Sequence, residues 1–359
     1  MKINFSILLL AFLQSACSLE IDYQPVVDFP NSTVQFSLDQ EPYSNLSSYQ
    51  FFSEDIKLHN PVEGVFPYQP INALFSDYAK KKRFIWLPPN SKSAYVSASK
   101  IIDFPLRSII IKTFYFDNVL PELSQRLIET RLLIRSSTGW QFANYIWNDS
   151  QTDAVLDLSG SYTNVQWQDG GELREVSYRI PSEAECLTCH KTAETATPIG
   201  PKPMNLNSSY SYDSGVENQL SHWVDNGYLE SNLPDNIPAV ASYTDEVIPL
   251  EDRVRGYLDI NCAHCHSDEA HCAYRDIRLD YMSTADSQNM GVCVVQDTQI
   301  DPSLSHIVTP NNPMRSVLYF RMNSTEEEYR MPLLGRSVVD EEGLQLIEDW
   351  INSLEVNCE

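Results

Sequence analysis

The pattern of apolar and polar positions separates a β-rich part of the chain, residues 61–180, from a helical and loop-rich part that follows it. Two runs rich in β-branched and aromatic residues are RSIIIKTFYFD (107–117) and RLIETRLLIRSSTGWQFANYIWN (126–148), the second a hairpin joined by SSTG. TDAVLDL and LREVSYRI add short strands, and GSYTN and DGGE indicate turns. Short strands at this spacing predict an antiparallel sandwich or barrel.

Helical spacing dominates the rest of the chain. Helices are predicted for VENQLSHWVDNGYL (216–229), PLEDRVRGYLDINCAHCH (249–266) and SVVDEEGLQLIEDWINSL (337–354). The last of these carries a clear apolar stripe at positions i, i+3, i+4 and i+7. We therefore expect an α+β fold of several domains, with an antiparallel β domain first and a mostly α-helical region after it.

One segment combines both patterns. ALFSDYAKKKRFIWLPP (73–89) predicts a short helix joined to a strand that stops at Pro88. Its KKKR run is expected to form a solvated charged face. Lysine and aspartate residues here and in KTFYF are also candidates for lining a substrate pocket.

The first residues predict export. Lys2 precedes the apolar run INFSILLLAFLQSACS, which is too short to span a bilayer comfortably and ends in small residues. LQSAC resembles a bacterial lipoprotein signal with Cys17 as the acylated residue, although Leu13 stands one position early. Ordinary signal cleavage is the alternative. Ser18 favours the outer membrane, so we expect a periplasm-facing or cell-surface protein held by a lipid anchor only.

The formal net charge of −24 restricts the partners. Nucleic acid is excluded as an expected partner, because the chain lacks the basic footprint that phosphate binding needs. An anionic membrane surface is disfavoured for the same reason. A basic protein is favoured because opposite fields steer encounter, while acidity that only keeps the protein soluble is the alternative.

Two short motifs carry the chemistry. ECLTCHK places Cys186, Cys189 and His190 in the same order as Cys262, Cys265 and His266 in INCAHCH. This repeated C-x-x-C-H pattern is typical of c-type haem attachment, in which both thiols bond to the haem and the histidine coordinates its iron. A four-cysteine zinc site is the alternative, and a thioredoxin-like C-x-x-C lacks its expected βαβ context.

A sixth iron ligand is expected if the haems carry electrons. For the second haem Met331 in YRMPLLG is the candidate, because methionine opposite histidine is common in cytochromes c and Pro332 stiffens the loop. For the first haem the candidates are Met204 in PIGPKPMNLN and His222 in the predicted helix. Ordinary packing is the alternative for each of these residues. An open sixth position would instead admit peroxide or another small ligand.

The remaining cysteines and histidines are less informative. Cys272 and Cys293 are candidates for a disulfide that leaves Cys358 unpaired, but three pairings stay open. His264 occupies an x position of the second motif and is expected to face solvent.

The chain resembles a family of bacterial exported dihaem c-type cytochromes, many of them lipoproteins. The resemblance rests on GVFPYQPINALFSDYAKKKRFIWLPP, FPLRSIIIKTFYF, IETRLLIRSSTGWQFANYIWNDSQTDA, YRIPSEAECLTCH, PIGPKPMNLN, INCAHCH and MPLLGRSVVDEEGLQLIEDWI. It implies two covalently attached haems and electron transfer as the activity, but no firm partner or substrate; a redox partner protein with a basic docking surface is expected from the charge. The order of helix, motif, long loop, Met-Pro and closing helix further resembles a class I cytochrome c.

These observations set the expected organisation: a signal peptide (1–16), a tether and irregular lead-in (17–60), a β domain (61–180), a first haem-binding region (181–245) and a cytochrome c-like domain with the second haem (246–359). An electron carrier is the main expectation. A haem enzyme, either peroxidase-like or oxidising a small substrate on the β domain, is the alternative. A docking lipoprotein is the third possibility.

Overall fold

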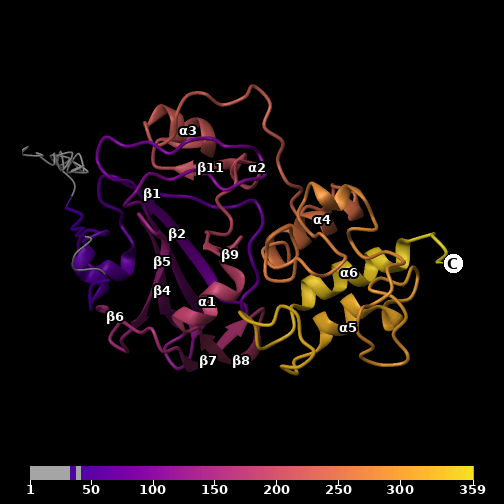
Figure 1. Cartoon of the computed structure of the whole chain (residues 1–359). Helices are drawn as coiled ribbons and strands as arrows, with labels where there is room; N and C mark the ends of the chain where they lie inside the picture. Colours follow the sequence, from indigo (N-terminus) through magenta and orange to yellow (C-terminus); the bar gives the residue numbers. More distant parts are fainter. Residues whose placement is uncertain (1–32, 38–41, 359) are drawn as a thin grey trace, which may run out of the picture.

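An eight-stranded antiparallel sheet is the largest element of the protein (Figure 1). The computed structural model describes residues 33–37 and 42–358. The strands run in the order β1 to β6, with a β7–β8 hairpin joined to the end of β3. Their bounds are β1 Val65–Pro67, β2 Lys80–Trp86, β3 Ile109–Val119, β4 Ser124–Ser136, β5 Gly139–Trp147, β6 Ala154–Leu156, β7 Ser161–Asp169 and β8 Glu172–Ile180.

The predicted mixture of antiparallel strands and helices is confirmed, with about 27% of residues in strands and 20% in helices. Among the described strands, β1 and β6 lie at opposite ends of one open sheet and do not pair with each other. The turn predicted at GSYTN is wrong, because strand β7 already begins at Ser161. Further along this strand, the alternate residues Val165 and Trp167 are buried in the core. The turn at DGGE is confirmed by Gly170 and Gly171, which both have positive φ.

One face of the sheet is covered by the segment that precedes it. This segment contains two short 3-10 helices, η1 Leu46–Tyr49 and η2 Ile56–Leu58. Tyr49 and Phe51 are buried against the aromatic side chains of β2 and β5, and the Tyr49 hydroxyl lies 3.1 Å from that of Tyr145. The described part of the lead-in is therefore part of the core.

The opposite face is covered by three short helices, α1 Glu183–Cys189, α2 Pro203–Leu206 and α3 Gln219–Asp225. Two small hairpins lie beside them, β9 Lys191–Thr192 with β10 Thr195–Ala196, and β11 Ser209–Tyr212 with β12 Gly215–Asn218. The helix predicted over 216–229 is wrong at its start, because residues 215–218 pair as β12. The Asn218 side chain then caps α3 through the backbone N–H groups of Leu220 and Ser221.

The C-terminal part forms a helical unit beside the sheet (Figure 1). Its helices are α4 Leu250–Asn261, α5 Val317–Asn323 and α6 Glu341–Ser353, with 3-10 turns η3 Ser283–Ala285 and η4 Pro313–Arg315. The helix predicted over 249–266 ends early, because the chain turns at Cys262, so the second motif follows α4 rather than lying on it. The apolar stripe predicted for the last helix is confirmed by the burial of Ile347, Trp350 and Ile351.

Helices α4 and α6 cross at close range. Gly343 lies against Tyr257, and a Cβ added to it would meet the tyrosine hydroxyl at 2.3 Å. The Tyr257 hydroxyl donates to the carboxylate of Asp340, which also caps α6. A residue without a side chain is therefore what allows the two helices to approach.

The loop before β2 connects the sheet to the helical unit. Asn72 donates to Ala241 O at 2.8 Å and to Gly256 O at 3.2 Å, and Phe75 N donates to the side chain of Asn261. Asp77 is 2% exposed and accepts bonds from Ser337 and Val338. The short helix predicted here is wrong, because Asp77 and Tyr78 have positive φ and the backbone bonds to distant partners.

No helix in the described residues is long and apolar enough to cross a membrane. Cys17 and the predicted signal peptide lie outside the described residues.

Candidate functional site

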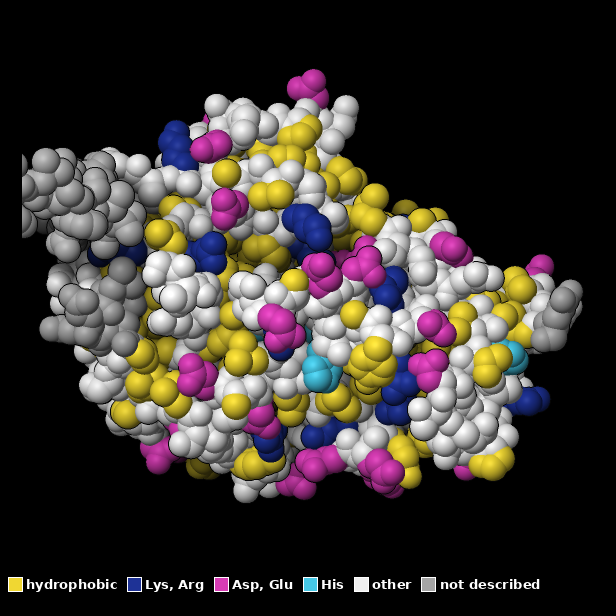
Figure 2. Space-filling model, viewed as in Figure 1, with side chains coloured by type: hydrophobic (Ala, Val, Ile, Leu, Met, Phe, Trp, Pro, Cys, Tyr) yellow, Lys and Arg dark blue, Asp and Glu magenta, His cyan; other side chains and the backbone are white. Residues whose placement is uncertain are grey.

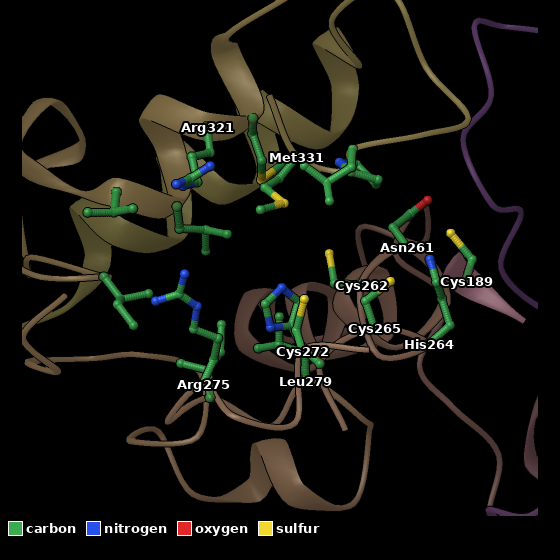
Figure 3. A pocket seen from close by; sticks show the side chains of 18 of the residues that line it. Cys189, Asn261, Cys262, His264, Cys265, Cys272, Arg275, Leu279, Arg321 and Met331 are labelled. Carbon is green, nitrogen blue, oxygen red and sulfur yellow. The ribbon is translucent and has the colours of Figure 1, made fainter. Parts of the chain in front are cut away.

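A cavity opens between α1, the end of α4 and the loops around α5 (Figure 3). Residues of both C-x-x-C-H motifs line it. They are Cys189 from the first motif, and Cys262, Cys265 and His266 from the second. Most of the remaining wall is apolar, from Ile277, Leu279, Ile307, Val317, Leu318 and Met322. The fold therefore gathers the residues that the sequence singled out around one apolar space.

The second motif is held by the end of α4. Cys262 closes the helix by donating its N–H to Leu258 O, and Cys265 and His266 then turn back onto Cys262 O at 3.1 and 3.0 Å. This turn places both cysteine side chains on the wall of the cavity. Burial raises the pKa of Cys262 to about 12, so the free thiol is protonated at neutral pH.

His266, the histidine of the second motif, has a neutral side chain. Its buried Nδ1 has no hydrogen-bond partner in the described part of the chain. Burial lowers the pKa of His266 to about 4, which keeps the imidazole neutral at pH 7. A neutral imidazole is the form that coordinates metal.

Met331 lies across the cavity from Cys262 and Cys265 (Figure 3). It belongs to the loop between α5 and α6, so the chain returns to the cavity from a distant part of the sequence. Its N–H donates to Arg321 O at 3.1 Å, and its carbonyl accepts from Arg336 Nε at 2.9 Å. The methionine loop is thus fixed by backbone contacts on both sides.

Arg336 stabilises this loop without a carboxylate partner. The side chain is 4% exposed and donates to five carbonyl oxygens, at distances of 2.9 to 3.0 Å. Three of these carbonyls, of Arg321, Met322 and Ser324, lie at the C-terminal end of α5, where helix carbonyls otherwise lack partners. Arg336 therefore connects the end of α5 to the segment that carries Met331.

The first motif sits on α1, which begins with a capping box between Ser182 and Glu185. Cys189 faces the cavity, whereas Cys186 is buried against the sheet beside Asn144 and Arg131. Burial raises the pKa of Cys186 to about 11. Of the first motif, then, one cysteine reaches the shared cavity and the other reaches the sheet.

His190 is held at one ring nitrogen. Its Nδ1 donates to Thr197 O at 3.0 Å, and its ring packs edge-on to Phe142 at 5.3 Å between centroids. Burial lowers the pKa of His190 to about 4. A hydrogen bond at Nδ1 leaves Nε2 available as a ligand. Metal-bound histidines in general have this arrangement.

The two motifs meet at Cys189, His264 and Cys265, whose ligand atoms all lie within 4.8 Å of one another. A hydrogen bond from the Cys265 thiol lowers the pKa of Cys189 well below its ordinary value and raises that of Cys265. His264 is half-buried and lines the cavity, so its predicted exposure to solvent is wrong. Among the described residues, no fourth cysteine, histidine or carboxylate completes this group.

Met204 and His222 lie away from the cavity. Met204 is fully buried in α2, where its N–H donates to Ala98 O. His222 donates through Nδ1 to Glu217 at 2.8 Å and stacks on Tyr212 at 3.5 Å between ring centroids. Neither residue lines the cavity that holds the second motif.

The remaining cysteines pair differently from the suggested Cys272–Cys293 loop. Cys293 forms a disulfide with Cys358, because the segment after α6 returns beside it. Cys272 is free, buried and part of the cavity wall. The arginines of this wall, Arg275, Arg321 and Arg336, carried no signal in the sequence that would have placed them here.

Comparisons with protein-family models, curated proteins and solved structures find no match to this chain.

Proposed function

We propose that the protein is an exported c-type cytochrome that carries single electrons, with one haem on the second motif and one on the first. The observation that carries this proposal is the shared cavity: Met331 lines it together with Cys262, Cys265 and His266. The sequence alone predicts that these four residues belong to one iron site. Met322 also lines this cavity, but the sequence pattern singles out Met331 through its Pro332 neighbour and the order of elements.

The residues of the second site fit a haem. Two cysteines and a neutral histidine lie on one wall, a thioether lies opposite, and the space between them is apolar. The buried Nδ1 of His266 has no hydrogen-bond partner among the described residues. When bound, the haem would supply an iron that exchanges one electron. Cys262 and Cys265 would hold the haem through thioether bonds, and His266 and Met331 would ligate its iron; a methionine ligand raises the potential.

Support for the first haem comes from the motif and from His190. The Thr197 carbonyl fixes the His190 ring and leaves Nε2 for iron. Of the two cysteines and the histidine of this motif, only Cys189 lines the described cavity. Its sulfur lies within 4.8 Å of that of Cys265, so the proposal gives the two haems neighbouring points of attachment.

The acidic charge supports a basic redox partner. Figure 2 shows Asp and Glu side chains spread over the visible face rather than gathered in one patch. A net charge of −24 would steer a basic protein toward the molecule. We propose that Cys17 anchors the chain at the outer membrane, as the signal sequence suggests.

A haem enzyme is the second candidate, and the surroundings of His222 favour it. This residue is engaged by Glu217 and by Tyr212, which makes it a poor sixth ligand for the first haem. An iron without a sixth ligand would accept a small molecule such as peroxide. The two candidates differ in the spin state of one of the two irons.

The test is expression with a c-haem maturation system, followed by intact mass and oxidised and reduced spectra. The proposal predicts a gain of two haems, sharp reduced bands and a weak oxidised band from Met–Fe ligation that disappears in Met331→Ala. Met314→Ala is the matched control, because Met314 is 72% exposed. A high-spin component would favour the enzyme, and bound zinc without covalent haem would overturn both.

A further inference from the structure

A row of positive side chains crosses one face of the sheet. Arg83 in β2 lies directly opposite Lys112 in β3, which lies opposite Arg131 in β4. Residues directly opposite each other in an antiparallel pair have their side chains on the same face of the sheet. Lys81 precedes Arg83 by two positions in β2, so its side chain lies on this face too. We call Lys81, Arg83, Lys112 and Arg131 the cationic row. Like charges placed directly opposite destabilise a sheet, so the row needs an explanation.

The cationic row interrupts an otherwise apolar surface. On one side lie Ile85, Ile110 and Leu133, two positions along the three strands that carry the row, and Phe142 on the neighbouring strand β5. On the other side lie Phe114 and Tyr178. All four cations are half-buried, and burial lowers the pKa of Lys81 and Lys112 well below the ordinary value. Lys81 and Arg83 of the KKKR run are therefore half-buried rather than part of the predicted solvated face, whereas Lys80 is exposed.

Of the four cations in the row, only Arg131 has a carboxylate partner among the described residues. Glu129 is fully buried and is used by Arg131, through Nε at 2.9 Å and Nη2 at 2.5 Å, and by the Tyr178 hydroxyl at 2.8 Å. Within the described residues, neither Arg83 nor Lys112 has a side-chain hydrogen bond or an ion pair. Lys112 Nζ instead lies over the Phe114 ring, 4.7 Å from its centroid.

Lys81 is also without an ion pair. It donates to Leu74 O at 2.8 Å, and the acids that act on it at longer range are Asp77 and Asp340. Both are engaged elsewhere, Asp77 by Ser337 and Asp340 by Tyr257. On the opposite face, Lys80 pairs with Asp117 at 2.8 Å. Lys82, also on the opposite face, has no ion pair among the described residues, so cations without a carboxylate partner occur on both faces; three of them, Lys81, Arg83 and Lys112, gather on the face under α1.

The row lies beside the first motif. Asn144, directly opposite Arg131, contacts Cys186, and its Oδ1 is buried without a hydrogen-bond partner. His190 packs on Phe142, the residue two positions before Asn144, and the charge of Lys112 acts on it. Any group attached to this motif therefore lies next to positive charge that no side chain of the described protein balances.

We propose that the cationic row is an anion site, which takes one or two carboxylate or other oxyanion groups through Arg83 and Lys112. A guanidinium binds such groups through two parallel bonds, and an ammonium adds a point charge. The anion has two possible sources: the carboxylates of a haem on Cys186 and Cys189, or a free small oxyanion. Only the first source depends on the proposed function.

The test compares Arg83→Met/Lys112→Met with Lys80→Met, which removes a lysine from the opposite face. Inorganic phosphate and succinate are titrated into the protein at constant ionic strength, with binding and thermal stability measured. If the anion is free, wild type binds one of these probes and the double variant binds it on the order of tenfold more weakly or worse. The Lys80 variant keeps its affinity.

If the haem supplies the anion, wild type binds neither probe. The double variant then moves the pH dependence of the first haem's reduction potential, because its carboxylates lose the cations that keep them ionised. Lys112→Arg, which keeps the charge, restores wild-type behaviour and shows that folding is intact. Intact mass reports separately whether haem is attached, so loss of the proposed function does not affect the phosphate and succinate titrations. Unchanged binding and unchanged pH dependence in the double variant would overturn the proposal.

Discussion

The two C-x-x-C-H motifs share a pattern but have different surroundings. The second follows a long helix, and its cysteines and histidine face an apolar cavity with Met331 on the opposite wall. The first sits on a seven-residue helix over a charged sheet face, and only Cys189 reaches that cavity. Under the proposed function, the same attachment chemistry is expected in both places. The neighbouring elements decide which ligand, charge and solvent access the attached group receives.

This difference separates the roles that we propose for the two sites. In the proposed function the second site would carry electrons, with Met331 as the sixth ligand of its iron. The first lies beside the cationic row, and His222, one of its two candidate sixth ligands, is bonded to Glu217. The predictions below test the contrast, beginning with the largest expected effect.

Removing the cysteines of one motif should remove one haem and leave the other. Cys262→Ala/Cys265→Ala should lose the haem whose oxidised spectrum carries the Met–Fe band. Cys186→Ala/Cys189→Ala should lose a haem and keep that band. Intact mass and the oxidised spectrum measure both results. Cys272→Ala is the control, because this free buried cysteine lines the same cavity but belongs to neither motif; loss of haem from it would contradict the assignment.

Replacing Arg336 should release the Met331 loop. Arg336→Met leaves five carbonyl oxygens without their donor, so we expect a loss of about 2–4 kcal/mol in the free energy of unfolding, together with loss of the Met–Fe band. Denaturant titration and the oxidised spectrum measure the two effects.

Arg330→Met is the matched control for Arg336. Arg330 is equally shielded at 8% exposed, but its bonds are long, at 3.4 to 3.5 Å. We expect it to cost about 1 kcal/mol or less. A Met–Fe band that survives in Arg336→Met would show that Arg336 does not position Met331.

Acid should distinguish the haem-free protein from the loaded one. Burial lowers the pKa of His59, His190 and His266 to about 4, so the unfolded chain binds more protons than the folded chain at mildly acidic pH. Stability is therefore complete above pH ~6.5 and falls as the pH drops toward ~4, by about 1–3 kcal/mol for each histidine.

In the haem-loaded protein only His59 should contribute to this loss, since iron would occupy the other two imidazoles. His59 bonds to Lys57 O and to Thr113 and has no part in either site. Equilibrium unfolding between pH 4 and 7 measures the difference in proton uptake. Equal pH dependence with and without haem would argue against ligation by His190 and His266.

The smallest effect is expected at His222. Because its ring is bonded to Glu217 and stacked on Tyr212, His222→Ala should leave the absorption spectrum unchanged and cost about 1 kcal/mol or less of stability. A shift of the first haem's Soret band would identify His222 as its sixth ligand instead.

The sequence predicted the elements whose periodicity matches their burial. The hairpin of β4 and β5 and the stripe on α6 are examples, because each buries one continuous face. The prediction from sequence was wrong where the backbone conformation, rather than the side-chain pattern, determines the type of element. Helical spacing suggested a helix from Val216, but Val216 is 71% exposed in a hairpin and the helix starts only after its Asn218 cap.

Contacts between distant segments were beyond the reach of the sequence. Met331 could be proposed from its Pro neighbour and the order of elements, but the five bonds of Arg336 join carbonyls from separate segments. The alternation of KKKRF places Lys81 and Arg83 on one face, yet nothing in the sequence shows that this face lies under α1. The proximity of Cys189 to Cys265 depends on packing in the same way.

The central claim is that both motifs carry covalent haem and that Met331 ligates the second iron. The most direct test is intact mass combined with the oxidised spectrum of the protein matured with haem, for wild type and Met331→Ala. We predict a mass gain of two haems in both proteins and a Met–Fe band in wild type alone. A protein that gains no haem and binds zinc through Cys189, His264 and Cys265 would contradict the account.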